Sequence, residues 1–269
     1  MRLSFLLTLL ILIFAPMHLS AVPKKKGTGI VAHRGYWNCE QAGYAKNSVA
    51  ALRCAQEAGL WGSEFDVNMT SDDVLLVYHD SNIDGKSIEK HPHSEFRDVK
   101  LANGENIPTL DAYLEQGRLH PETMLVCELK GHSTPEVENR LIMLTLAKLK
   151  EYKLLDPERV MFISFSFHIC RTLAQMLPEH TVQFLGSSKN PYELHEAGIN
   201  GVDYNHAVYS KHQNWNKMAR KKRMSVNAWT VDRKEDILKM LDMKVDQITT
   251  DEPLKVRQLM QEFKYKERR

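Results

Sequence analysis

Short β-like runs alternate with longer helical patterns along most of the chain, and this alternation constrains the fold more than any other feature. Eight such runs stand at the spacing of βα units, and they cover residues 29–33, 63–69, 124–130, 159–166, 181–186, 198–205, 225–232 and 246–251. Helical patterns between consecutive runs predict parallel strands with covering helices. No Gly-x-Gly-x-x-Gly turn follows the first run, which disfavours a dinucleotide-binding sheet. The sequence therefore predicts an α/β fold, a closed (β/α)8 barrel of the TIM type.

The second strand is followed by two departures from this regular alternation. A turn at residues 70–73 separates it from another β-like run at 74–80. So short a connection requires antiparallel strands, because a parallel crossover needs a dozen residues or more. We therefore expect a short hairpin arm outside the parallel sheet. The polar, weakly periodic segment 81–109 is expected to form a small insertion over one end of the barrel.

Two helices have clear start signals. Asn47 or Ser48 is expected to cap a helix that begins shortly after the first strand. The clearest helix is expected to start at Thr134, with Pro135 in its first turn and apolar residues continuing through Leu149. Both helices fall between predicted strands, as the barrel requires.

The two ends of the chain are expected to lie outside the regular barrel. An uncharged apolar run, residues 3–15, follows Arg2 and precedes a stretch of small residues. This pattern predicts a secretory signal peptide over residues 1–21, and the run is short of the roughly 20 residues that span a bilayer, so no stable membrane anchor is expected. Residues 22–28 are interpreted as a linker and 29–269 as the barrel domain. The chain is thus expected to be exported, periplasmic or secreted, with a frayed helix as its basic tail.

Charge and cysteine content bear on partners and compartment. The 36 Lys and Arg residues nearly balance the 34 Asp and Glu residues, which argues against a nucleic-acid partner because charge-driven binding needs a concentrated basic face. Cys39, Cys54, Cys127 and Cys170 could pair in an oxidising compartment. Their spacing matches no metal or redox motif, so no disulfide is predicted.

Polar residues interrupt the carboxyl ends of the first strands, where an αβ barrel carries its working residues. They are His33 and Arg34 after the first strand, Glu64 and Asp66 on the second, His79 and Asp80 at the end of the hairpin arm, and Glu128 and Lys130 on the third barrel strand. Residues two apart on a strand share one face, so Glu64 and Asp66 are expected to point together into the barrel.

Three converging carboxylates would repel one another and lose hydration, so something positive must compensate. A divalent cation held by oxygen ligands is the simplest answer, with Lys130 as a nearby structural cation. Zinc is less favoured, because no His and Cys pair at ligand spacing accompanies the acids. His33 and His79 can serve as general base and general acid near neutral pH, and Arg34 offers a planar donor fork for phosphate. Together these groups favour phosphodiester cleavage over glycoside hydrolysis.

A set of motifs in the chain closely resembles glycerophosphodiester phosphodiesterases. The motifs are HRG at 33–35, NS at 47–48, EFDV at 64–67, HD at 79–80, IPTL at 107–110, ELK at 128–130, WTVD at 229–232 and ITTD at 248–251. The resemblance runs from about residue 29 to 253 and implies a βα barrel. It also implies hydrolysis of a small phosphodiester substrate to glycerol 3-phosphate and an alcohol.

The resemblance further implies a role for each candidate catalytic residue. His33 and His79 would form the acid–base pair. Glu64, Asp66 and Glu128 would bind one divalent cation, Ca²⁺ or Mg²⁺.

Three other residues would face the substrate, and two departures from the family lie around them. Arg34 would grip the phosphate, Lys130 would line the pocket near it, and Trp229 would form an apolar wall for the glycerol or the leaving alcohol. Lys46 stands where most members of the family have Glu, and the usual Arg-Thr-Thr after HD is replaced by SNIDGKSI at 81–88. Both departures bear on substrate identity more than on reaction type.

The sequence leaves two alternatives open. A phospholipase-type barrel would cleave lipid or lysolipid phosphodiesters through a cyclic phosphate, and it would need an apolar ridge at its mouth, for which the insertion offers little besides Phe96. A non-catalytic barrel would only bind phosphorylated or sugar ligands, and it has no evident use for both imidazoles. The alcohol headgroup, the identity of the cation and the oligomeric state stay open.

Overall fold

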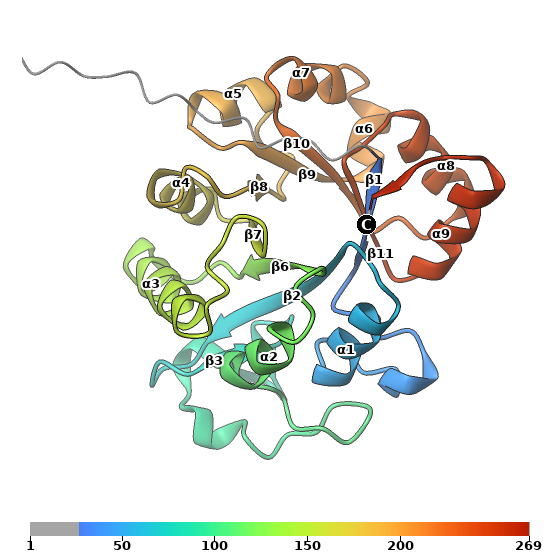
Figure 1. Ribbon diagram of the computed structural model, residues 1–269. Coiled ribbons are helices and arrows are strands. Elements are labelled where there is room, and N and C mark those ends of the chain that lie inside the picture. Colours follow the sequence, from blue (N-terminus) through green and yellow to red (C-terminus); the bar gives the residue numbers. More distant parts are fainter. Residues whose placement is uncertain (1–26, 269) are drawn as a thin grey trace, which may run out of the picture.

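Eight parallel strands close into a barrel in the computed structural model, which describes residues 27–268 (Figure 1). In chain order these strands are β1 Thr28–Ala32, β2 Gly62–Met69, β6 Met124–Leu129, β7 Val160–Ser164, β8 Val182–Phe184, β9 Gly201–Asn205, β10 Ser225–Trp229 and β11 Gln247–Thr250. β1 pairs in parallel with both β2 and β11, so the first strand is joined to the last. The predicted (β/α)8 TIM-type barrel is confirmed.

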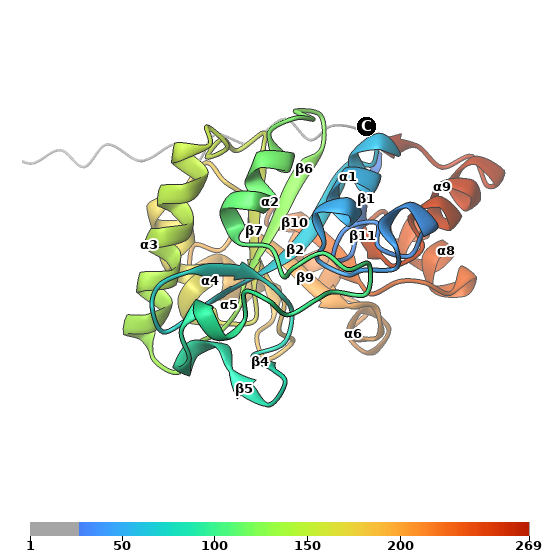
Figure 2. The same cartoon turned by 90° about the horizontal axis from the view of Figure 1, so that it is seen from below.

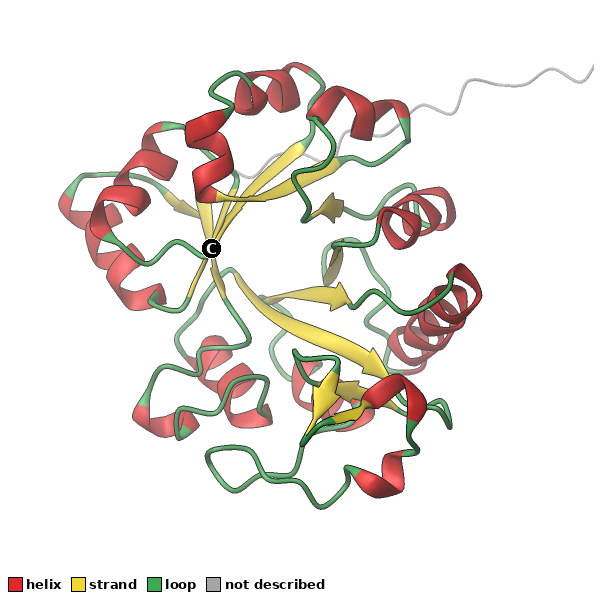
Figure 3. Ribbon diagram, turned by 180° about the vertical axis from the view of Figure 1, so that it is seen from behind, coloured by secondary structure: helices red, strands yellow, loops and turns green. Residues whose placement is uncertain are grey.

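Helices surround the strands on the outside of the barrel (Figure 3). They are α1 Val49–Glu57, α2 Leu110–Gly117, α3 Pro135–Glu151, α4 Phe167–Met176, α5 Pro191–Glu196, α6 His206–Lys211, α7 Trp215–Lys221, α8 Lys234–Asp242 and α9 Pro253–Glu262. The side chain of Ser48 caps α1 by accepting from the Ala51 N–H, and Thr134 caps α3 in the same way. Both predicted helix starts are confirmed, with Ser48 rather than Asn47 as the cap.

The alternation of side chains along β2 decides which residues face the barrel interior. Phe65 and Val67 are fully buried in the large apolar core that also contains the inner faces of the helices. Glu64 and Asp66 alternate with them, so they point the opposite way, into the barrel. A second, smaller apolar cluster lies among the inward-facing residues, and it includes Val31, Val126, Met161, Ile163 and Leu185. Glu64 and Asp66 thus share the barrel interior with apolar side chains.

The insertion after β2 folds around a small core of its own. β3 Leu75–Val77 pairs antiparallel with β2, which confirms the hairpin arm. β4 Asn82–Ile83 and β5 Lys86–Ser87 then form a two-stranded sheet, followed by the 3-10 turns η2 Ile88–Lys90 and η3 His93–Glu95. The core of this segment consists of Leu76, Ile83, Ile88, Phe96 and Ile107. Phe96 is 1% exposed, so it offers no apolar ridge to a membrane.

The carboxyl end of the chain and the β4–β5 sheet lie at opposite ends of the barrel (Figure 2). The prediction of a frayed helical tail is wrong: α9 ends at Glu262, and β12 Glu267–Arg268 then pairs in parallel with the start of β1. The Arg268 guanidinium lies 4.8 Å from the centre of the Trp61 ring, which gives the basic tail an aromatic partner. The predicted signal peptide, most of the linker and residue 269 lie outside the described residues. Within residues 27–268, no helix combines the length and apolar character needed to cross a bilayer.

Candidate active site

Three carboxylates meet at the carboxyl ends of β2 and β6. Asp66 on β2 lies directly opposite Glu128 on β6 in the strand register, and Glu64 precedes Asp66 by two residues on the same face. Their exposed fractions are 2% for Glu64, 1% for Asp66 and 7% for Glu128. One oxygen from each carboxylate lies within 4.8 Å of the others. The structure therefore brings the three predicted metal ligands together.

Two cationic residues contact this acidic cluster. Lys130 Nζ lies 3.1 Å from Asp66 Oδ1 and 2.6 Å from Glu128 Oε1. The Arg34 backbone N–H donates to Glu64 Oε2 at 2.7 Å, and Arg34 Nε lies 3.9 Å from Asp66 Oδ2. Both residues predicted to face the phosphate thus stand beside the predicted metal ligands.

Burial and nearby charges shift the pKa values of the three acids in different directions. Burial, followed by repulsion from Asp66 and Glu128, raises the pKa of Glu64 well above its usual value. Burial and the charge of Asp66 raise the pKa of Glu128 to about 7, against the opposing effect of Lys130. Burial alone would also raise the pKa of Asp66, but Lys130 and a hydrogen bond from Asn47 outweigh it and lower the value.

A divalent cation fits this donor set. Glu64 Oε1 is buried without a hydrogen-bond partner in the described part of the chain, so an oxygen lone pair is left over for a ligand. The donors are all carboxylate oxygens, the hard ligands that Ca²⁺ and Mg²⁺ prefer. The acidic cluster could therefore bind a metal ion.

Asn47 supports the cluster in a way that sequence reasoning missed. Its Nδ2 donates to Asp66 Oδ2 at 2.8 Å, and its Oδ1 accepts from the Asp66 backbone N–H at 3.3 Å. The residue has a φ of 59° and is 1% exposed, so a small polar side chain suits it. The NS motif is the signal of this role in the sequence, whereas the local pattern alone predicts only a helix cap at Asn47.

His33 is held by a carboxylate from the far end of the chain. Its Nδ1 donates to Asp251 Oδ1 at 2.8 Å, and Trp37 Nε1 donates to the same oxygen at 2.9 Å. A carboxylate only accepts hydrogen bonds, so the proton of a neutral His33 is fixed on Nδ1 and Nε2 is left to exchange protons. Burial would raise the pKa of Asp251, but the hydrogen bond and charge of His33, together with the Trp37 hydrogen bond and the charge of Lys46, outweigh burial and lower the pKa.

Neither Asp251 nor Trp37 is among the site residues predicted from the sequence. Asp251 directly follows β11, the last barrel strand, so its position at a carboxyl strand end was an available signal. Trp37 lies in the loop after β1, and nothing in the local pattern marks it.

His79 stands close to the acidic cluster on the hairpin arm. Its Nδ1 donates to Asp80 Oδ1 at 2.6 Å, and its side chain is 40% exposed. Burial lowers the pKa of His79; the charge of Asp66 opposes this and that of Lys130 adds to it. Both predicted acid–base histidines therefore carry a carboxylate on Nδ1.

An aromatic pair stands at the carboxyl ends of β7 and β10. The predicted wall residue Trp229 donates from Nε1 to the Asp203 backbone carbonyl at 2.9 Å, which fixes its ring. Phe165 meets it edge to face, with ring centres 5.5 Å apart, and is 50% exposed. Phe165 is not among the residues predicted from the sequence, because an aromatic residue at a strand end has the same local pattern as one in the core.

Lys46, the departure from the family, contacts an aromatic ring. Its Nζ lies 4.3 Å from the centre of the Trp37 ring, and Trp37 is the residue that donates to Asp251. The positive charge of Lys46 also helps to lower the pKa of Asp251. Lys46 therefore belongs to the surroundings of His33.

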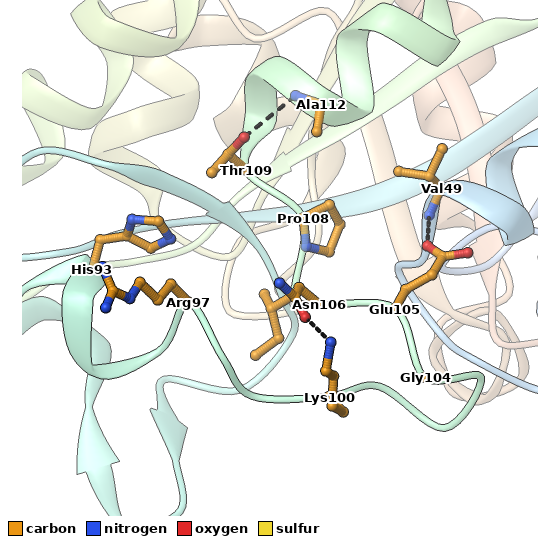
Figure 4. Close-up of a pocket in the computed structure, with 11 residues that line it drawn as sticks. Val49, His93, Arg97, Lys100, Gly104, Glu105, Asn106, Pro108, Thr109 and Ala112 are labelled. Carbon is orange, nitrogen blue, oxygen red and sulfur yellow. Dashed lines mark hydrogen bonds between the residues drawn. The ribbon is translucent and has the colours of Figure 1, made fainter.

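A separate pocket of about 600 Å³ lies between the insertion and the starts of α1 and α2 (Figure 4). None of the predicted site residues lines it. Its polar groups bond to one another: Glu105 Oε2 accepts from the Val49 N–H at 3.0 Å, and Lys100 Nζ donates to Asn106 Oδ1. The pocket therefore lies at the contact between the insertion and α1, and it is separate from the candidate active site.

The chain is similar to known proteins over most of its length. Residues 33–255 match the model of the glycerophosphoryl diester phosphodiesterase family. The crystal structure of a glycerophosphodiester phosphodiesterase from Parabacteroides distasonis superposes with a TM-score of 0.85 and 39% identity, covering 88% of this chain and 98% of that one. A glycerophosphodiester phosphodiesterase from Caldanaerobacter subterraneus is 29% identical, over 84% of this chain and 95% of its own. An Oleispira antarctica phosphodiesterase, solved in complex with the product sn-glycerol-3-phosphate, shares the fold at a TM-score of 0.75 and 22% identity, covering 87% of this chain and 97% of that one.

Proposed function

Because the chain belongs to the glycerophosphoryl diester phosphodiesterase family and is thus a phosphoric diester hydrolase, we propose that it hydrolyses small glycerophosphodiesters to glycerol 3-phosphate and an alcohol. The observation that carries this proposal is the meeting of Glu64, Asp66 and Glu128 beside Lys130 and Arg34. The glycerol 3-phosphate bound to the O. antarctica relative supports that product.

The proposed mechanism divides the work between charge stabilisation and proton transfer. Glu64, Asp66 and Glu128 would hold Ca²⁺ or Mg²⁺, which when bound supplies polarisation of the phosphoryl group. Arg34 and Lys130, which both contact Asp66, would bind the phosphate oxygens.

His33 and His79 would move the protons. One imidazole accepts a proton from the attacking water at Nε2, and the other protonates the oxygen of the leaving alcohol. The carboxylates at both Nδ1 atoms stabilise the imidazolium that forms and keep each ring in one orientation. Trp229 and Phe165 would face the apolar edge of the substrate.

Turnover of soluble diesters tests the proposal directly. We expect the purified chain to release glycerol 3-phosphate from glycerophosphocholine and glycerophosphoethanolamine with Ca²⁺ or Mg²⁺, to stop in EDTA, and to recover when the cation is restored. Turnover that is the same with and without EDTA would contradict the proposed role of the cation in catalysis. Failure with both cations and both diesters would contradict the substrate class.

Two further experiments distinguish the proposed hydrolysis from the two alternative functions. His33→Ala and His79→Ala are each expected to lower turnover at least about 10²-fold while the folded state survives, the usual scale for loss of a general acid or base. Rates equal to that of the unsubstituted chain in both variants would contradict the acid–base roles of the histidines, whereas binding of the diesters without turnover would favour a barrel that only binds. Faster cleavage of lysolipid vesicles than of soluble diesters, with a cyclic phosphate product, would favour the phospholipase-type reaction.

We also propose that the chain is exported to the periplasm or the medium, which rests on the apolar run of residues 3–15. N-terminal sequencing of the protein recovered from its host is expected to start near residue 22. A recovered chain that still begins at Met1 would contradict the proposal.

A further inference from the structure

Two of the four cysteines meet where the loop that follows β1 packs on α1. Cys39 directly precedes η1, the 3-10 turn Glu40–Ala42, and Cys54 lies within α1. Both pack in one apolar cluster, together with Ala51 and Trp37. Cys54 is 6% exposed, whereas Cys39 is only partly buried and so can be reached from solvent.

Backbone contacts fix the loop on the helix at this point. The Tyr36 N–H donates to the Ala51 carbonyl at 2.9 Å, which attaches the start of the loop to α1. Cys54 follows Ala51 by three residues and therefore lies on the same helix face. Cys39 Sγ donates to the Tyr36 carbonyl at 3.2 Å, which keeps its sulfur near the same point. The two thiols thus approach each other although they lie on different elements.

We propose that Cys39 and Cys54 form a reversible disulfide, which makes this pair a site of oxidation that fastens the loop to α1. The oxidant is a donor disulfide such as oxidised glutathione. The Cys39 thiolate attacks one sulfur of the donor, releases one glutathione thiol and forms a mixed disulfide. The Cys54 thiolate then attacks the Cys39 sulfur and releases the second glutathione thiol. Each cysteine loses one proton and one electron, and the donor is reduced to two thiols.

The surroundings set the order of these two steps. Burial, and then the hydrogen bond with the Cys39 sulfur, raises the pKa of the Cys54 thiol to about 12, so Cys54 is a poor first nucleophile. Cys39 is the more exposed of the two and reacts first with the external disulfide.

The loop that the disulfide would fasten also supports the candidate active site. Trp37, in the same cluster, donates to Asp251, and Asp251 accepts from His33. Cys127 on β6 and Cys170 on α4 are fully buried elsewhere in the barrel, so they serve as internal controls.

Peptide mapping of the full chain tests the proposal. The protein is incubated with oxidised or reduced glutathione, alkylated under denaturing conditions and digested with trypsin. Lys46 and Arg53 lie between the two cysteines, so a disulfide joins two separate peptides, 35–46 and 54–86. This linked mass is expected after oxidation and is lost on reduction. Four alkylated cysteines after oxidation, or glutathione on Cys39 with Cys54 alkylated, would overturn the proposal.

Matched variants add a second readout. Oxidation is expected to raise the Tm of the unsubstituted chain by about 5 °C. The Tm of Cys39→Ser is expected to stay the same on oxidation. In Cys54→Ala, the reaction is expected to end at a mixed disulfide of Cys39 with glutathione. Cys170→Ala is the control and keeps the oxidation-dependent shift. The same shift in Cys39→Ser would show that another pair is responsible. Mass and Tm do not depend on turnover, so this proposal and the proposed function fail or succeed separately.

Discussion

At the scale of single residues, each of the two candidate acid–base histidines donates from Nδ1 to a carboxylate, but the two carboxylates come from different parts of the chain. Asp251 reaches His33 across the closure of the barrel, from a position 218 residues away, whereas Asp80 reaches His79 from the adjacent position. In both cases the carboxylate fixes the protonated nitrogen and leaves Nε2 for chemistry. The hydrogen bond between Asp251 and His33 depends on the folding of the whole barrel, whereas that between Asp80 and His79 joins adjacent residues.

Asp251→Asn is therefore expected to lower kcat about 10- to 100-fold with little change in KM. The amide can present its NH₂ group to His33 Nδ1, and the ring then loses its fixed tautomer. Steady-state rates across a range of pH with glycerophosphocholine measure this. Glu252→Gln is the matched control at the next position, where the side chain accepts from Asn38, and its kcat is expected to be unchanged. A loss confined to KM would contradict the positioning role.

Asp203 on β9 provides a prediction about stability. It is 1% exposed, and neither carboxyl oxygen makes a hydrogen bond of normal geometry within residues 27–268. Burial, and then the charge of Glu128, raises its pKa well above the usual value, and the nearby Asn227 amide opposes this only in part. The folded chain therefore keeps this proton at a pH where the unfolded chain has released it. Its contribution to stability is present below the unfolded-state pKa and is lost as pH rises towards the folded-state pKa.

Asp203→Asn is expected to remove this loss of stability at high pH, because an amide carries no titrating proton. The variant is therefore expected to gain stability relative to the unsubstituted chain as pH rises, so the difference in the free energy of unfolding between them is more positive at pH 8 than at pH 5. Urea unfolding at the two values measures the difference. Asp98→Asn, whose carboxylate is 87% exposed, is expected to show none. An Asp203→Asn effect that does not change with pH would mean that this carboxyl is not protonated in the folded chain.

At the scale of elements, β2 and the β1–α1 connection assemble the site. β2 carries two of the three acids, and the Tyr78 N–H donates to the Asp66 carbonyl at 3.0 Å, which ties the end of the hairpin arm, and His79 with it, to the acidic cluster. In the β1–α1 connection, the Gly35 N–H donates to the Glu64 carbonyl at 2.9 Å. The turn that presents His33 and Arg34 is thereby fixed against β2.

Gly35→Ala is expected to destabilise the fold by about 2 kcal/mol or more. Gly35 has a φ of +77°, and an added Cβ would lie 2.6 Å from Ala51 Cβ and 2.8 Å from the Ala51 backbone carbon. Gly59→Ala is the matched control, since its φ is +59° and nothing lies within 4 Å of the added atom. It should cost only about 1 kcal/mol of backbone strain. Equal losses in urea unfolding would contradict the close packing of the loop on α1.

At the scale of the whole molecule, closing the barrel gathers acidic side chains in its interior. Glu64, Asp66, Glu128 and Asp203 are all buried there. A cation that binds only the folded chain stabilises it, by about 2.7 kcal/mol at a concentration 100 times its Kd. We therefore expect Ca²⁺ or Mg²⁺ to raise the Tm by about 5 °C or more and EDTA to reverse the rise.

Glu64→Gln is expected to reduce that shift, because it replaces a charged ligand by an amide and leaves the rest of the cluster in place. Glu115→Gln, with a half-exposed side chain on α2, is the control and should keep the full shift. Differential scanning calorimetry with and without each cation measures both. An equal Tm in EDTA and in saturating cation would argue against a metal site.

Strand alternation, helix caps and the i, i+2 spacing of Glu64 and Asp66 are local properties of the chain, so the barrel, the hairpin arm and the three acids could be predicted from the sequence alone. The groups that support the three acids became identifiable with the folded chain. The contacts of Asp251 with His33, of Asn47 with Asp66 and of Cys39 with Cys54 join residues on different elements, and no local pattern specifies which of these residues meet. The apolar core of the insertion and the strand formed by the tail likewise depend on surfaces that exist only once the barrel has closed, and burial, which sets the pKa values of the site, does not exist before that step.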